Sequence, residues 1–168
     1  EHDAQTARIG GGLLTPQGLH LEFDPRALRT RARRDGNEYV IEGEKTFITS
    51  GIRADFYTVA VRTGGPGPGG VSLLLIEKGT PGFTQTPLRK MGWWCSDTAT
   101  LYFDNCRVPV ENLLGEEGKG FIYLMENLPQ ERISIAVIAA AAMEAVLEET
   151  LQYTKDRKEI GRASCRER

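Results

Sequence analysis

The stretch "TATLYFDNCRVPVENLLGEEGKG", residues 98–120, contains the point at which the hydrophobic pattern of the chain changes. Residues 98–109 are rich in β-branched and aromatic side chains and end at a proline, which is typical of a strand. From Val110 onward this pattern is lost, a glycine-containing loop follows, and a helix is expected from about Lys119. The sequence therefore predicts a β domain followed by a helical segment.

Further strands are predicted upstream of this point. The predicted elements are a hairpin over 30–51, with turn signals at 35–37 and 42–44, and strands over 55–63, 71–79 and 83–88. Short strands separated by turns favour an antiparallel sandwich or barrel.

The glycine-rich stretch "GPGPGG", residues 65–70, has the GxGxxG spacing of dinucleotide-binding loops. That motif requires a strand before it and a helix after it, so that the phosphate meets the helix N-terminus. Here a strand is predicted after it. A hairpin loop is therefore the better interpretation.

A second helix is expected from about Pro129 to Arg157, because proline suits the first turn of a helix, where its missing N–H is not needed. The apolar run from Ile133 to Leu147 has 15 residues, fewer than the roughly 20 that a membrane helix needs. It is apolar on nearly every face, which is typical of a helix inside a bundle. The partner helices of that bundle are not in this sequence.

Composition excludes several classes of function. The chain has 168 residues and a net charge of −2, and its Lys and Arg residues are scattered, which argues against nucleic acid or an anionic membrane as a partner. Three cysteines without a CxxC motif, and only two histidines, argue against a disulfide framework or a metal site and favour a reducing compartment. The chain lacks an initial Met and a visible signal peptide, so we expect a fragment.

The stretch "NLPQERISIA", residues 127–136, places Glu131 and Arg132 next to a nearly unbroken apolar run. A carboxylate in apolar surroundings has a raised pKa, which suits a general base near neutral pH. The alternative is an acidic residue that complements the dipole at a helix start, with the arginine on the surface. The pattern alone leaves both interpretations open.

From about Arg29 to Lys158 the chain resembles the acyl-CoA dehydrogenase family of flavoproteins. The resemblance rests on "GEKTFITSG", "KMGWWCSDTATLYFDNCRVP", "NLLGEEGKGF", "LPQERISIA" and "YTKDRKEIG", which occur in family order and spacing. The "LPQER" form is most similar to long-chain-type members. The resemblance implies an α+β multidomain fragment: an antiparallel β-sandwich or barrel as middle domain (30–112), then the first long helix of a four-helix-bundle domain (113–159).

The resemblance also implies a reaction. Glu131 is expected to be the catalytic base that removes the α-proton of a fatty acyl-CoA, while the β-hydrogen leaves as hydride to flavin N5 of FAD, giving a trans-2-enoyl-CoA. Pro129, Gln130 and Arg132 are expected to line the acyl-CoA pocket. Nothing in the sequence selects the acyl chain length.

The same resemblance assigns residues to the cofactor. Phe47, Ile48 and Thr49 correspond to the flavin-contacting segment, in which an aromatic side chain packs on the isoalloxazine and the Thr hydroxyl approaches N5. The usual aromatic residue is Trp, and Phe keeps its packing face but loses the N–H. Arg157 corresponds to the arginine that reaches the FAD pyrophosphate of a neighbouring subunit, where a bidentate guanidinium suits phosphate.

The resemblance further implies an electron-transfer flavoprotein as acceptor, a homotetramer built as a dimer of dimers, and residence in the bacterial cytoplasm or the mitochondrial matrix. Two alternatives remain open: a related flavin dehydrogenase or oxidase with another substrate, and a non-catalytic β-sandwich binding module. Residues 1–29 do not resemble the family and are expected to be loop-rich, and residues 160–168 are expected to be a non-native tail.

Overall fold

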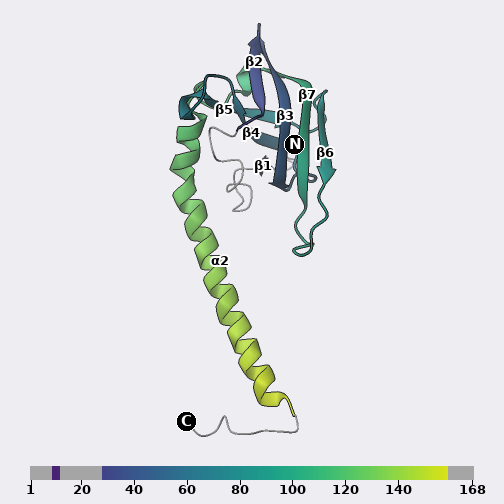
Figure 1. Cartoon of the computed structure of the whole chain (residues 1–168), viewed down its shortest axis with the longest axis vertical. Helices are drawn as coiled ribbons and strands as arrows, with labels where there is room; N and C mark the ends of the chain where they lie inside the picture. The colour runs from purple at the N-terminus through teal and green to yellow at the C-terminus, as the bar shows by residue number, and fades with distance from the viewer. Residues whose placement is uncertain (1–8, 12–27, 159–168) are drawn as a thin grey trace, which may run out of the picture. The chain divides into compact units, whose positions relative to one another are not determined.

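The structure is a computed structural model, and it describes residues 9–11 and 28–158 (Figure 1). The predicted segments 1–29 and 160–168 therefore lie almost entirely outside the described residues. Contacts divide the chain into two compact units, Glu1–Glu131 and Arg132–Arg168. The strands are β1 (Ile9–Gly11), β2 (Arg31–Asp35), β3 (Glu38–Thr49), β4 (Phe56–Arg62), β5 (Val71–Glu77), β6 (Phe83–Pro87) and β7 (Thr98–Pro109), and the helix is α2 (Gly120–Asp156).

The strands form one seven-stranded sheet in the order β1-β4-β2-β3-β7-β6, with β5 paired to β4. Its longest pairing joins β3 and β7, two antiparallel strands of 12 residues each. The pairs β2–β3, β4–β5 and β6–β7 are also antiparallel, whereas β4 meets β1 and one end of β2 in parallel. The predicted β domain, followed by a long helix, is therefore confirmed.

The two ends of the sheet face one another across the core. Tyr57 on β4 packs edge to face on Phe83 of β6, with ring centroids 4.9 Å apart, and Phe83 stacks on Phe103 of β7. Gln85 Nε2 on β6 also donates a hydrogen bond of 3.1 Å to the Tyr57 hydroxyl. These contacts curl the sheet around a core of Tyr39, Ile41, Val61, Leu74, Ile76, Leu101 and Val108, among others.

The turn predicted at residues 42–44 is wrong, because β3 runs through it. The pairing of β3 with β7 shifts between Ile41 and Gly43, which is the signature of a β-bulge. Gly43 has a φ of 130°, and a Cβ added there would lie 2.8 Å from the Thr30 Cα. The glycine thus marks a bend inside a strand rather than its end.

The division into two helices at Pro129 is also wrong, because α2 is one helix of 37 residues with Pro129 inside it (Figure 1), and its start at Gly120 agrees with the helix predicted from about Lys119. An interior proline removes the bond that the Met125 carbonyl would accept and costs about 3 kcal/mol. The first residue of the helix packs closely on the sheet, since a Cβ on Gly120 would lie 2.9 Å from Ser72 backbone atoms. Tertiary contacts at the first turn therefore override the local signal of the proline.

Within the described residues, the second unit consists of α2 from Arg132 onward and the two residues after it. Its large apolar side chains are exposed, as expected for a bundle helix without its partners. They are Ile133, Val137, Ile138, Met143, Val146, Leu147, Leu151 and Tyr153, with exposed fractions of 50–68%. Among the described residues, no helix is both long and apolar enough to cross a membrane.

Replacing Tyr57 by Phe should destabilise the chain by about 1–2 kcal/mol, because it removes a buried hydroxyl and leaves its partners unpaired. That hydroxyl lies 3.0 Å from the Gly51 carbonyl oxygen and 3.1 Å from that of Ala54. The measurement is denaturant unfolding of the 168-residue chain. The control is Tyr102→Phe on β7, whose residue is 41% exposed and which should change stability little.

Ionisation of Tyr57 should also lower the stability of the fold at high pH. Burial, followed by the nearby charges of Asp97 and Asp55, raises the pKa of Tyr57 from 10.0 to about 12. The protonated hydroxyl therefore contributes stability that is fully present below pH 10 and is lost as the pH rises through about 12. Tyr57→Phe should lack that alkaline decline, and an identical decline in both proteins would contradict this origin.

Candidate functional site

Residues 47–49, at the end of β3, occupy an unusual backbone conformation. Phe47 has a φ of 63°, in the left-handed region, and its side chain is 45% exposed. Ile48 is buried in the core, whereas Thr49 is half-buried and pairs with Thr98 of β7. The backbone at Phe47 is therefore strained and its side chain is exposed, while Thr49, two residues later, is paired with β7.

The β3–β4 turn, residues 50–55, is held by Asp97, which lies just before β7. The Asp97 carbonyl oxygen accepts from the Ser50 N–H at 3.1 Å. Its Oδ2 accepts from the N–H groups of Ile52 at 2.8 Å and Arg53 at 3.2 Å, and its Oδ1 accepts from Arg53 Nε at 2.6 Å. We call these four hydrogen bonds the Asp97 network.

The protonation of Asp97 follows from these contacts. Partial burial by itself raises the pKa of the carboxyl. The hydrogen bonds from the Ile52 N–H, then from the Arg53 side chain and N–H, outweigh burial and hold the pKa below its ordinary value of 3.8. The carboxylate is therefore ionised at neutral pH and acts only as an acceptor.

The segment between β7 and α2 is fastened to the sheet. The Tyr39 hydroxyl on β3 donates to Glu117 Oε2 at 2.9 Å, and the Gly118 N–H donates to Ser72 Oγ at 2.8 Å. The Leu114 N–H donates to the Leu73 carbonyl oxygen at 2.9 Å. The first turns of α2 thereby have a defined start on the same β domain that carries residues 47–49.

Glu131 lies on α2, about three turns after the start of the helix at 3.6 residues per turn. Its residue is half-buried, and desolvation raises the pKa of the carboxyl above its ordinary value of 4.5. Pro129, Gln130 and Arg132, the other residues predicted for the substrate pocket, are its neighbours in the same helix and are exposed. The dipole interpretation is wrong for Glu131, because the helix begins at Gly120 and not at Pro129.

Arg157 follows the last residue of α2, in the second unit. Its N–H donates to the Tyr153 carbonyl oxygen at 3.0 Å, and its Nη1 donates to the Tyr153 hydroxyl at 3.2 Å. The guanidinium also lies 5.6 Å from the centroid of the Tyr153 ring. The structure thus places the predicted residues in three groups: 47–49 on β3, 129–132 on α2, and Arg157 at the C-terminal end of α2.

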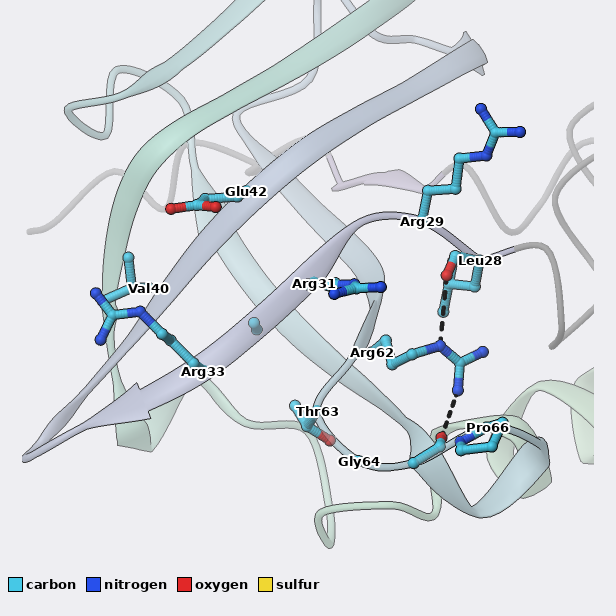
Figure 2. Close-up of a pocket in the computed structure, with 12 residues that line it drawn as sticks. Leu28, Arg29, Arg31, Arg33, Val40, Glu42, Arg62, Thr63, Gly64 and Pro66 are labelled. Carbon is cyan, nitrogen blue, oxygen red and sulfur yellow. Dashed lines mark hydrogen bonds between the residues drawn. The ribbon is translucent and has the colours of Figure 1, made fainter.

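A pocket of about 1030 Å³ lies at β2 and the β4–β5 loop, and its lining residues in Figure 2 do not include Phe47, Thr49 or Glu131. Arg62 occupies it and donates to the carbonyl oxygens of Leu28, from Nε at 3.4 Å, and Gly65, from Nη1 at 2.6 Å (Figure 2). This arginine therefore organises the glycine-rich loop 64–70.

The structure of the loop supports the hairpin interpretation of the GxGxxG stretch and not the dinucleotide-binding one. A short 3-10 turn, Pro68–Gly70, leads directly into β5, so no helix N-terminus is available for a phosphate. Among the residues that the structure describes, no group of His, Cys, Asp or Glu side chains is arranged to hold a metal ion.

The sequence analysis missed Asp97. The available signal was an acidic residue directly before a predicted strand, where aspartate side chains commonly accept hydrogen bonds from turn N–H groups. That signal indicates a turn but does not identify the distant segment that the carboxylate binds. The Asp97 side chain binds residues 44 or 45 positions away in sequence, which only the fold reveals.

A family model described as "Acyl-CoA dehydrogenase, middle domain" matches residues 20–106, and one described as "Acyl-CoA dehydrogenase, C-terminal domain" matches residues 118–167. The long-chain specific acyl-CoA dehydrogenase of Mus musculus is 44% identical over 92% of this chain and 36% of its own length. The isobutyryl-CoA dehydrogenase of Bos taurus is 41% identical over 82% of this chain and 33% of its own length.

A solved structure of an acyl-CoA dehydrogenase is also similar to this chain. The acyl-CoA dehydrogenase of Geobacillus kaustophilus superposes with a TM-score of 0.82 at 44% identity, covering 92% of this chain and 41% of that one. The chain therefore spans well under half the length of each of these relatives.

Replacing Phe47 by Gly should leave the chain more stable than replacing it by Ala, by about 1–2 kcal/mol, because only glycine adopts a positive φ without strain. Denaturant unfolding of both variants measures the difference. The matched pair is Tyr102→Gly and Tyr102→Ala within β7, where the order should reverse by roughly 0.5–1 kcal/mol. The same order at both positions would contradict a strained conformation at Phe47.

Proposed function

The chain belongs to the acyl-CoA dehydrogenase family, and from this premise we propose that the protein oxidises a fatty acyl-CoA to its trans-2-enoyl-CoA with FAD as cofactor. The observation that carries the proposal is the partly desolvated carboxyl of Glu131 on α2, within the family's "LPQER" motif. Members of this family are oxidoreductases. The substrate and the roles of individual residues are our proposal.

Glu131 acts as the general base that removes the α-proton of the thioester. The α-proton is weakly acidic, so the base must have a pKa nearer to that of the activated substrate than an ordinary glutamate has. Desolvation moves the pKa of Glu131 in this direction. Pro129, Gln130 and Arg132, which flank the carboxylate on α2, line the acyl-CoA pocket.

Residues 47–49 fit a flavin ring. Phe47 offers an exposed aromatic face on a backbone that holds it out of the sheet, and Thr49 offers a half-buried hydroxyl two residues away. A planar ring system packs on such a face, and the hydroxyl reaches a ring-edge nitrogen. When bound, FAD supplies the acceptor for the β-hydrogen, which leaves as hydride.

Arg157 contributes a guanidinium to the FAD pyrophosphate of a neighbouring subunit, since a planar fork of N–H donors suits phosphate oxygens. This role requires an oligomer, for which we propose a dimer of dimers. An electron-transfer flavoprotein is the proposed electron acceptor, and the bacterial cytoplasm or the mitochondrial matrix is the proposed location.

The acyl group is the least constrained part of the proposal. The two relatives described above are named for a long-chain and for a short branched substrate. The "LPQER" motif supports the long-chain class. Helices that this chain does not contain set the depth of the pocket.

Replacing Glu131 by Gln in the full-length protein should lower kcat by about a hundredfold to ten-thousandfold, because an amide cannot accept the α-proton. The wild-type rate should rise with pH through the pKa of Glu131, since only the ionised base works, and this pKa lies above 4.5. The measurement is formation of enoyl-CoA with an artificial electron acceptor across pH.

The control is Glu126→Gln, an exposed residue of the same helix, which should retain wild-type turnover. Full activity in Glu131→Gln would refute the assignment of the base. Peroxide formation without an added acceptor would instead assign the protein to an oxygen-reducing branch of the superfamily.

A further inference from the structure

We infer that Asp97 is a positioning residue for the flavin site: it holds the β3–β4 turn, and through that turn residues 47–49, in the conformation that receives the ring. The inference rests on the proposed function, because residues 47–49 matter in this way only if they contact flavin. Asp97 itself contacts neither the cofactor nor the substrate.

The segment that Asp97 holds is strained and needs support. Phe47 has a φ of 63° and Ser50 a φ of 58°, so two non-glycine residues on either side of Thr49 lie in the left-handed region. Such conformations persist only where surrounding contacts enforce them. Ser50 directly follows Thr49, the last residue of β3, so a change of conformation at Ser50 would loosen the end of the strand that carries Phe47 and Thr49.

The Asp97 network supplies that support. Three N–H groups of the turn, those of Ser50, Ile52 and Arg53, donate hydrogen bonds to Asp97. The Gly51 N–H does not. Gly51 instead lies against the strand, where an added Cβ would be 2.6 Å from the Ala99 Cβ. Hydrogen bonds from Ser50, Ile52 and Arg53 therefore tie the turn to Asp97, directly before β7.

The Asp97 and Arg53 side chains are not part of the hydrophobic core, but the turn that they hold carries the buried Ala54, so stability is measured beside flavin binding in every variant. The Asp97 side chain is 19% exposed and that of its partner Arg53 is 55% exposed. The core beneath the turn is made by apolar residues such as Ile48, Ala54 and Ala99. Removing the carboxylate should thus loosen the turn while the sheet remains intact.

The two oxygens of the Asp97 carboxylate have different partners, and the contacts of each can be tested separately. Oδ2 binds the turn N–H groups, whereas Oδ1 binds the Arg53 side chain. Asp97→Asn keeps one acceptor oxygen for the turn and loses the ion pair, which Arg53→Ala also removes. Asp97→Ala removes both halves.

The experiment uses the full-length protein purified with FAD. For each variant, the measurements are the FAD dissociation constant, the visible flavin spectrum, and the stopped-flow rate constant of flavin reduction by the acyl-CoA that the wild type oxidises. The unfolding midpoint is measured in parallel with and without FAD. Amide hydrogen exchange at Ile52 and Arg53 reports on the network without any cofactor.

Asp97→Ala should weaken FAD binding by roughly tenfold or more, because it removes hydrogen bonds to a charged group that preset the site. It should also shift the flavin spectrum and slow flavin reduction. Asp97→Asn and Arg53→Ala should have smaller effects, which should not add in the double variant. The control Glu38→Gln removes a carboxylate of an exposed pair with Arg107, 3.1 Å apart, and should match the wild type.

Two results would overturn the inference. One is wild-type FAD affinity and spectrum in Asp97→Ala. The other is an equal loss of stability with and without FAD, with an unchanged spectrum and reduction rate, which indicates a purely structural residue. If Asp97→Ala does not fold, Asp97→Asn and Arg53→Ala decide by the same readouts.

Failure of the proposed function gives a different result. A wild-type protein that binds no FAD or oxidises no acyl-CoA refutes that proposal and the inference with it. A wild type that does both, combined with indifference to Asp97, refutes the inference alone. Unchanged exchange protection of the Ile52 and Arg53 amides in Asp97→Ala would refute the network itself.

Discussion

The antiparallel pairing of β3 with β7 is the constraint on which the rest of the structure depends. It runs from Glu38 opposite Pro109 to Thr49 opposite Thr98, with two register shifts between these ends. A shift of one residue in this register would turn every core side chain of both strands toward solvent. The same register brings Asp97 to the end of β3, because Asp97 immediately precedes β7.

The pairing of β3 with β7 contains two bulges. The register shifts between Ile41 and Gly43 and again between Lys45 and Ile48. The second shift includes Phe47, whose ring a regular ladder would place above or below the sheet, not at its end. The strain at Phe47 is thus a consequence of how the longest strand pair is built.

Local sequence predicted the elements well where one local signal dominates. The four strands β4 to β7 follow from β-branched and aromatic runs between turn residues, and the structure confirms them. The errors at Gly43 and Pro129 have one cause: a residue that often ends an element was interpreted without its tertiary contacts. Gly43 packs against Thr30 and Gly120 packs against Ser72, and neither contact is visible in a linear sequence. For the same reason the family resemblance assigns residues 47–49 to the flavin, which stays a prediction, and assigns no role to Asp97.

The pKa of Glu131 depends on how much water reaches its carboxyl group. Desolvation is the cause that raises the pKa of Glu131, and Glu131 is the last residue of the first unit. The helix continues directly into apolar side chains, such as Ile133 and Val137, that are more than 60% exposed. Any helices that cover these side chains would remove further water from the carboxylate and raise its pKa more. Under the proposed function, the packing of the helical domain therefore helps to set the strength of the catalytic base. The apolar run after Arg132 then serves catalysis as well as stability, because a base for a weakly acidic carbon needs that dry environment.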